Sequence, residues 1–214
     1  IFGEKSSGGK VELLVERVLQ GNEVIAHLRV SKKPVIGATI RMAKAFDAQL
    51  LGRWPTSDGP LFYLRFSDEQ GRDPYALMQA FGHVPLPSYI HRGDDTTDHT
   101  RYQTLFAKVP GAVAAPTAAL HFDEESLSAI RDKGVSLAQV TLHVGAGTFS
   151  PVKVEKISEH TMHHERYWVP AATQEAIEKC RANGGRVVAV GTTTVRTLES
   201  WAQSGQASGD TNIF

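Results

Sequence analysis

Histidine and glutamate side chains stand at three places in this chain with types and spacing suited to acid–base chemistry. "HTMHHE" holds His163 and Glu165, "TLHVGAG" places His143 beside two glycines, and "PGAVAAPTAALHF" runs through small residues to His121. Histidine titrates nearest to neutral pH, and a neighbouring carboxylate can orient its ring. The three segments therefore predict a site that moves protons at close range.

The glycine pair in "TLHVGAGTFSPV" first suggests a phosphate cradle. A dinucleotide fingerprint needs a third glycine and a following helix, but Gly145 and Gly147 lead into Thr-Phe-Ser-Pro. No Gly-Lys-Ser/Thr follows either, which excludes a P-loop. Because glycine lets a ligand come close to the backbone, the pair is interpreted as a wall of a binding site.

"VAVGTTTVR" predicts an anion site. Thr193 lies among three threonines at the start of a predicted helix, and a helix N-terminus favours negative charge. Arg196, one turn later, can donate a fork of hydrogen bonds to a carboxylate or phosphate. The alternative is that the threonines only cap the helix and that Arg196 is solvated.

A metal site is the alternative use of the histidine cluster. The zinc-protease pattern is His-Glu-x-x-His on a helix, whereas this chain has His-x-x-His-His-Glu at 160–165 beside a strand-like "YWV". Acid–base work suits the cluster better. His27, His91 and His99 are interpreted as structural or surface residues.

Aromatic and basic residues near position 90 predict a platform for a nucleobase. Tyr89 ends the stiff "GHVPLPSYI" segment, and Arg101 and Tyr102 open "RYQT". Together they can stack on a base and hold it. A hinge packed by its aromatics is the equal alternative.

The composition bounds the class of protein. The 214 residues carry 23 Lys+Arg and 23 Asp+Glu, so net neutrality argues against a general polyanion binder, although a local basic patch can still contact RNA. The single Cys180 excludes an internal disulfide and a cysteine metal cluster. No membrane-spanning run or signal peptide is present, which predicts a soluble cytoplasmic protein. Both ends of the chain look like cuts through something longer.

The elements that must position these residues fall into two predicted domains. Residues 1–82 contain short alternating segments ("KVELLVERV", "EVIAHLRV", "VIGATI", "AQLLGRW", "LFYLRF") and then a helix after Asp73-Pro74, which predicts a small antiparallel β-barrel or sandwich. In residues 83–214, "VSLAQVTLHV" and the buried run "RVVAVG" are predicted strands between capped helices. This alternation predicts an α/β domain with a layered sheet and helices.

The chain resembles the S-adenosylmethionine:tRNA ribosyltransferase-isomerase (QueA) family of queuosine biosynthesis. The resemblance lies in long strings that occur in order over nearly the whole sequence: GGKVELLVER, GHVPLPSYI, RYQTLFA, PGAVAAPTAALHF, TLHVGAGTFSPV, HTMHHE and RVVAVGTTTVRTLES. It implies a six-stranded β-barrel on an α/β domain, S-adenosylmethionine as co-substrate, no metal, and a tRNA partner. It also implies that the barrel domain lacks its start here and the α/β domain its C-terminal part. We expect a monomer.

The reaction that this resemblance implies sets chemical requirements. The ribosyl part of S-adenosylmethionine passes to 7-aminomethyl-7-deazaguanine at the tRNA wobble position, giving epoxyqueuosine, adenine and methionine. A base must remove a proton next to the sulfonium, the attacking amine must be neutral, and the departing adenine needs a proton. The hypothesis gives these tasks to His121, His143, His163 and Glu165. Substrate binding is assigned to Tyr89, Arg101, Tyr102, Gly145, Gly147, Thr193 and Arg196.

Two other classes of function are the alternatives. A non-catalytic RNA-binding module would use the barrel and hinge as its contact surface, but it leaves the titratable cluster without a purpose. An S-adenosylmethionine methyltransferase lacks the glycine-rich loop expected after its first strand. The products separate all three classes, because only the ribosyltransferase releases adenine and methionine together.

Overall fold

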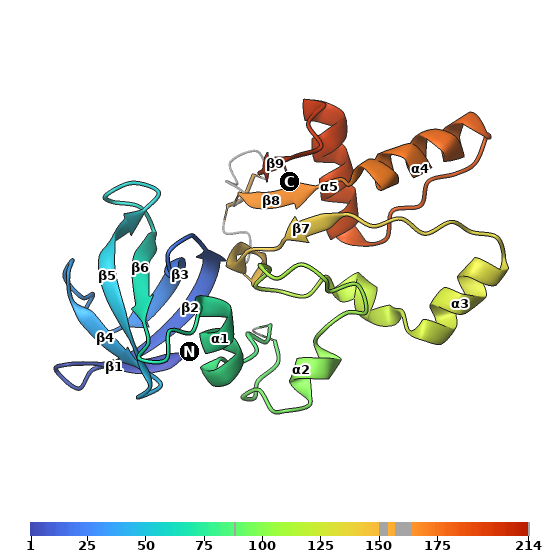
Figure 1. The fold of residues 1–214 in the computed structure, drawn as a ribbon. Helices are drawn as coiled ribbons and strands as arrows, with labels where there is room; N and C mark the ends of the chain where they lie inside the picture. The colour runs from blue at the N-terminus through green and yellow to red at the C-terminus, as the bar shows by residue number, and fades with distance from the viewer. Residues whose placement is uncertain (88, 150–153, 157–163, 214) are drawn as a thin grey trace. The chain divides into compact units, whose positions relative to one another are not determined.

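The computed structural model describes residues 1–87, 89–149, 154–156 and 164–213. Contacts divide the chain into two compact units, Ile1–Pro85 and Leu86–Phe214. Figure 1 shows strands alone, followed by one helix, in the first unit and a mixture of helices and strands in the second. Among the described residues, no helix is both long and apolar enough to cross a membrane.

The first unit is a closed six-stranded antiparallel barrel, which is one of the two architectures that the strand pattern predicts and the one that the family resemblance implies. Its strands are β1 (Phe2–Lys5), β2 (Lys10–Val18), β3 (Glu23–Val30), β4 (Thr39–Met42), β5 (Phe46–Trp54) and β6 (Leu61–Ser67), in the order β1-β2-β3-β6-β5-β4. The short strand β1 closes the barrel by pairing with β2 on one side and β4 on the other. No pattern in the sequence predicts β1, and β4 begins at Thr39 rather than at Val35, the exposed residue where the predicted strand starts.

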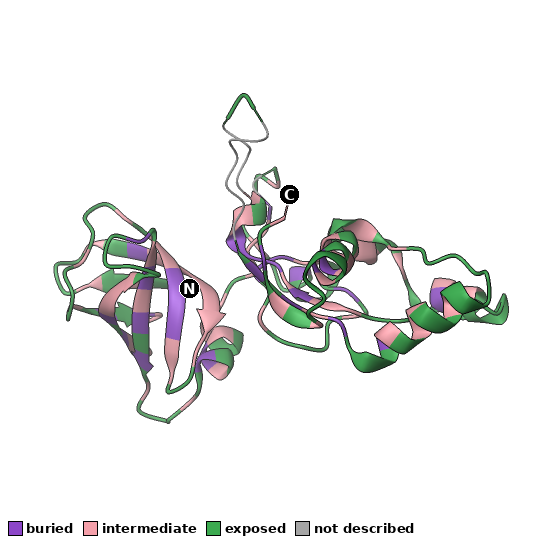
Figure 2. Cartoon of the chain, turned by 90° about the horizontal axis from the view of Figure 1, so that it is seen from above, coloured by how far each residue is buried: buried purple, intermediate pink, exposed green. Residues whose placement is uncertain are grey.

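Alternation explains why this barrel has a core. Successive strand residues point to opposite faces, so Val11 and Leu13 on β2 and Ile40 and Met42 on β4 reach the interior. Figure 2 shows these buried stretches on the strands. The interior cluster is completed by Val24, Ala26, Phe46, Ala48, Leu50, Phe62, Leu64, Phe66 and Leu77.

Helix α1 (Pro74–Phe81) begins and ends where the sequence predicted. The Asp73 side chain accepts a hydrogen bond from the Ala76 N–H at 2.8 Å, and Pro74 occupies the first turn. Gly82 ends the helix in an extended conformation, and its backbone N–H donates to Met78 O at 2.7 Å. A Cβ at Gly82 would lie 2.2 Å from that carbonyl oxygen, so only glycine fits there.

The second unit holds a three-stranded antiparallel sheet in the order β7-β8-β9, formed by β7 (Thr141–His143), β8 (Glu165–Trp168) and β9 (Ser208–Thr211). Its helices are α2 (Asp98–Arg101), α3 (Glu124–Asp132), α4 (Ala171–Ala182) and α5 (Gly191–Ser204), with 3₁₀ turns η1 (Thr117–His121) and η2 (Ala146–Phe149). Helix α5 contacts β7 and β9. A small core lies on this sheet, made of Ala114, Leu142, Val144, Tyr167 and Val169.

Two predicted strands of this unit differ in the structure. "VSLAQVTLHV" forms a strand only over Thr141–His143, and the run at 186–190 forms none, leaving Val188 76% exposed. An apolar run becomes a strand only when a neighbouring strand takes up its backbone hydrogen bonds, and none of the described strands pairs with 186–190. The three described strands form an antiparallel sheet, and the layered α/β arrangement of this unit stays a prediction.

Candidate functional site

The centre of the candidate site is the buried carboxylate of Glu165, the first residue of β8. Its side chain is 3% exposed; Oε1 accepts the Gly145 backbone N–H at 2.9 Å, and Oε2 accepts from Arg196 Nη1 at 2.5 Å. A buried carboxylate is stable only when both oxygens are matched in this way. Three residues predicted to belong to one site are thus joined by hydrogen bonds, although they come from the link between β7 and η2, from β8 and from α5.

The segment before His121 contacts both the residue that follows β7 and the start of α5. The Val113 N–H donates to Val144 O at 2.8 Å, which extends the pairing at the end of β7. A Cβ built at Gly191, the first residue of α5, would lie 2.9 Å from Ala118 Cβ, so η1 packs directly on the start of α5. The small residues of "PGAVAAPTAAL" therefore allow close approach of three segments that are distant in sequence.

His143 at the end of β7 is held by close packing. Its ring centroid lies 5.1 Å from that of Trp168 in an edge-on arrangement. Gly111 has a φ of 140°, and a Cβ there would lie 2.5 Å from His143 Cε1, so the ring rests on bare backbone. Arg166, the strand partner of His143, stacks on Trp168 with its guanidinium carbon 5.0 Å from the ring centroid. Sequence reading missed Gly111 and Trp168.

The start of α5 holds the predicted anion-binding residues. Thr193 lies in the first turn, and its carbonyl oxygen accepts from Thr197 Oγ1 at 2.9 Å. The helix has no side-chain cap, since its N-cap residue is Val190, so the threonines do not act as the cap. Arg196 is 22% exposed and gives Nη1 to Glu165. Of the wall glycines, Gly145 is buried and Gly147 is half-buried in η2.

The predicted nucleobase platform is partly assembled. Tyr89 is 71% exposed, while Tyr102, which ends α2, is half-buried. Burial raises the pKa of Tyr102, the nearby Tyr89 adds to the rise, and a hydrogen bond with the Ala115 backbone opposes it. The two tyrosines therefore lie close to each other and to the small-residue segment. Arg101 is exposed on α2, near enough to Asp98 to lower the pKa of that carboxyl slightly.

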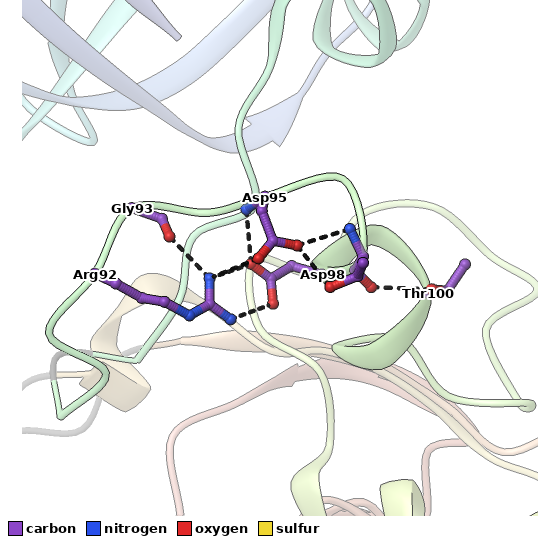
Figure 3. A network of polar contacts seen from close by, with 6 residues as sticks. Arg92, Gly93, Asp95, Asp98 and Thr100 are labelled. Carbon is purple, nitrogen blue, oxygen red and sulfur yellow. Dashed lines mark hydrogen bonds and ion pairs between the residues drawn. The ribbon is translucent and has the colours of Figure 1, made fainter.

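An ion pair that no sequence pattern marks lies between Tyr89 and Arg101 in the chain. The Arg92 guanidinium donates to both oxygens of Asp98, at 2.6 and 2.7 Å, and the Asp95 N–H donates to Asp98 Oδ2 at 2.8 Å. Figure 3 shows Arg92 reaching across the loop to this carboxylate. The Arg92 hydrogen bonds and then the Asp95 N–H lower the pKa of Asp98 to about 2. Because Asp98 begins α2, this pair fixes the helix that carries Arg101.

Of the other two predicted catalytic histidines, the structure describes only His121. His121 ends η1 as an exposed residue, in a 3₁₀ turn rather than at the end of a strand. His163 lies outside the described residues, as does His160 of the possible metal cluster. Within the described ranges, no three His, Cys, Asp or Glu residues are grouped as a metal site would require.

A family model described as queuosine biosynthesis protein matches residues 1–214. The S-adenosylmethionine:tRNA ribosyltransferase-isomerase of Azoarcus sp. (strain BH72) is 51% identical over 217 residues, covering 100% of this chain and 61% of the relative. The crystal structure of an S-adenosylmethionine tRNA ribosyltransferase from Thermotoga maritima is 26% identical, with a TM-score of 0.35, covering 100% of this chain and 55% of that one. This chain thus spans less than two thirds of the curated relative's length.

Proposed function

This chain belongs to the queuosine biosynthesis protein family, and on that premise we propose that it is the greater part of an S-adenosylmethionine:tRNA ribosyltransferase-isomerase. The substrate is S-adenosylmethionine together with tRNA carrying 7-aminomethyl-7-deazaguanine at the wobble position. The products are epoxyqueuosine-tRNA, adenine and methionine. The observation that carries the proposal is the convergence of Gly145, Glu165 and Arg196 beside His143.

His143 is the proposed acid–base group at the wall of the site. Its ring is fixed between neighbours on β8 and the Gly111 backbone, which gives it the constant position that proton transfer requires. The chemistry needs a proton taken from the carbon next to the sulfonium and a proton given to the departing adenine. His121 and His163 remain proposed partners for the other proton transfers.

Glu165 is proposed to position the site, because both of its oxygens already have partners. The carboxylate holds the Gly145 backbone in the wall and orients the Arg196 guanidinium. Direct proton transfer by Glu165, as the sequence hypothesis assigned, would require it to give up one of these hydrogen bonds. Its contribution is therefore to the geometry of the groups around it.

Arg196 and Thr193 are proposed to hold the methionine carboxylate. Arginine has five N–H donors, so the hydrogen bond to Glu165 leaves others for a ligand. The first-turn N–H groups of α5, which receive no side-chain cap, add a favourable position for negative charge. Tyr89, Tyr102 and Arg101 are proposed to hold a base by stacking and polar contacts, and Gly147 to complete the wall with Gly145.

Product analysis tests this function. The protein is incubated with S-adenosylmethionine and tRNA that carries the aminomethyl-deazaguanine, and the nucleoside products are separated. Adenine and methionine appearing together support the proposal. S-adenosylhomocysteine would indicate a methyltransferase, and unchanged S-adenosylmethionine with bound tRNA would indicate a binding module. The layered α/β completion of the second unit, the monomeric state, the lack of a metal and the cytoplasmic location remain predictions.

A further inference from the structure

An open groove of about 1030 Å³ crosses the barrel where β1 runs between β2 and β4; we call it the barrel groove. It lies within the first unit and shares no residue with the candidate site. Apart from Lys44, which lies in the turn after β4, its charged residues occupy strand positions, and those on β2 and β4 lie next to buried core residues and therefore point outward. The lining residues that carry charge are Glu4, Lys10, Glu12, Arg29, Arg41 and Lys44.

Cations outnumber carboxylates in the barrel groove by four to two. Arg29 Nη1 lies 3.6 Å from Glu12 Oε2, and the two side chains are 89% and 46% exposed. Arg41 is paired with Asp47 at 3.1 Å, again with both side chains over 40% exposed. Exposed pairs of this kind are weak and exchange readily for another anion. In the described part of the chain, Lys10 and Lys44 make no ion pair.

The turn that presents Lys44 is conformationally costly. Ala43 and Lys44 are the central residues of the turn Met42–Ala45, and their φ values are 49° and 58°. Asparagine and glycine are the residues that such turns prefer, because a Cβ disfavours positive φ. Arg41 Nη2 braces the turn by donating to Lys44 O at 3.4 Å. Lysine disfavours the positive φ of this position, so its presence here indicates that its charge has a function.

The barrel groove also has an exposed aromatic surface. Phe2 is 53% exposed and rests on His83, with ring centroids 5.0 Å apart. Cations that follow a groove together with an aromatic face are the arrangement by which proteins bind RNA strands, with phosphates on the cations and a base on the ring. The chain as a whole has zero net charge, so its composition alone does not reveal this local excess of positive charge.

We propose that the barrel groove is an RNA-binding surface that contacts tRNA phosphates through Lys10, Arg29, Arg41 and Lys44 and stacks an unpaired base on Phe2. The proposal rests on the proposed function for the choice of tRNA as partner. Charge complementarity selects the RNA backbone over a neutral ligand. Glu4 lies between Lys10 and Arg41 in the strand register and limits the attraction.

Binding of a fluorescent tRNA anticodon stem-loop, without S-adenosylmethionine, tests the proposal. The full chain is compared with Lys10→Gln/Lys44→Gln, and the matched control is Lys133→Gln/Lys179→Gln, two exposed lysines of the second unit. Thermal unfolding checks that each variant is folded. Loss of two phosphate contacts should reduce the slope of log K against log salt by about 1.4. The control should keep the wild-type slope.

Two single variants sharpen the test. Glu4→Gln should tighten RNA binding, because it removes the carboxylate between two cations, and a purely structural role would not produce this sign. Phe2→Ala should weaken binding at least about fivefold with an unchanged salt slope. Equal affinity and slope for the wild type and the lysine double variant would overturn the proposal, as would preference for an acidic peptide over RNA.

Adenine release separates this proposal from the proposed function. If adenine is released normally and the lysine double variant keeps its affinity, salt slope and KM for tRNA, the groove proposal fails and the enzyme assignment stands. If no adenine is released but the variants weaken RNA binding as expected, the groove proposal stands without the enzyme assignment.

Discussion

Glu165 and Arg196 form a partly buried ion pair, 2.5 Å between Oε2 and Nη1, that joins the start of β8 to α5 across 31 residues of sequence. The second carboxylate oxygen accepts the Gly145 N–H, so a single side chain ties together the three segments of the proposed site. The catalytic proposal depends on this connection, because it sets where the glycine wall and the arginine fork lie.

Glu165→Gln should destabilise the protein by about 3 kcal/mol, because it leaves the Arg196 charge without its buried partner. Urea unfolding measures this loss, and Glu175→Gln on the exposed side of α4 is the matched control. A double-mutant cycle with Arg196→Gln should give a coupling energy above about 1 kcal/mol. An unfolding midpoint for Glu165→Gln equal to that of the control would contradict the importance of this pair.

Gly111→Ala should disturb the ring of His143. The new Cβ would lie 2.5 Å from Cε1, and the φ of 140° is unfavourable for alanine. We expect a loss of about 1–3 kcal/mol in the free energy of unfolding and a lower rate of adenine release. Gly93→Ala is the control, since a Cβ there meets nothing within 4 Å. If both variants behave alike, the close packing of His143 has no consequence.

His143→Ala should reduce adenine release by at least about 100-fold while the protein remains folded, because a positioned acid–base group contributes that much or more. His27→Ala, in the barrel unit, removes a histidine to which no catalytic role is assigned and should keep full activity. Circular dichroism checks both folds. Full turnover by the His143 variant would end its catalytic assignment.

Acid should destabilise the second unit through Asp98. The Arg92 hydrogen bonds lower the pKa of this carboxyl from 3.8 to about 2. A lowered folded-state pKa means that the stabilisation is complete above the unfolded-state pKa and is lost as pH falls toward 2. Asp98→Asn should therefore be less stable than wild type at neutral pH, and the difference should shrink between about pH 4 and pH 2.

Denaturant unfolding across this pH range checks the prediction. Asp132→Asn, an exposed aspartate at the end of α3, is the control and should follow the wild-type curve. The pKa of Asp68 is likewise lowered to about 2 by Arg72. Because Asp68 is present in every variant, its contribution to the pH dependence of stability is the same in all of them. A constant difference between wild type and Asp98→Asn down to pH 2 would show that the charge of Asp98 is not the cause.

The barrel was predictable because four of its strands, β2, β3, β5 and β6, run over seven to nine residues. β2 and β3 begin and end where the pattern placed them, and the turn between them has positive φ at Gly21 and Asn22. β9 was missed, since "SGDT" has residues that strands disfavour and pairing with β8 alone defines it. Residues 186–190 were predicted as a strand but form none, because an apolar run does not by itself specify which neighbouring strand would pair with it.

Of the candidate site, the sequence indicated which segments would meet but not how. The glycine pair Gly145 and Gly147 predicts close approach of a ligand, whereas the tight contacts at Gly111 and Gly191 join segments of the chain itself and are marked by no pattern. The Arg92–Asp98 pair lies in a polar loop without periodicity, so no pattern marked it. The engagement of both Glu165 oxygens depends on distances across β8 and α5, which sequence spacing does not contain.

The most direct test of the central claim is the stoichiometry of adenine release. The protein is given excess S-adenosylmethionine and a limiting amount of tRNA, and free adenine is measured at completion. The account predicts one adenine for each tRNA that carries 7-aminomethyl-7-deazaguanine, and none with tRNA that has ordinary guanine at the wobble position. Adenine released without the modified base, or none released with it, would contradict the ribosyltransferase-isomerase assignment.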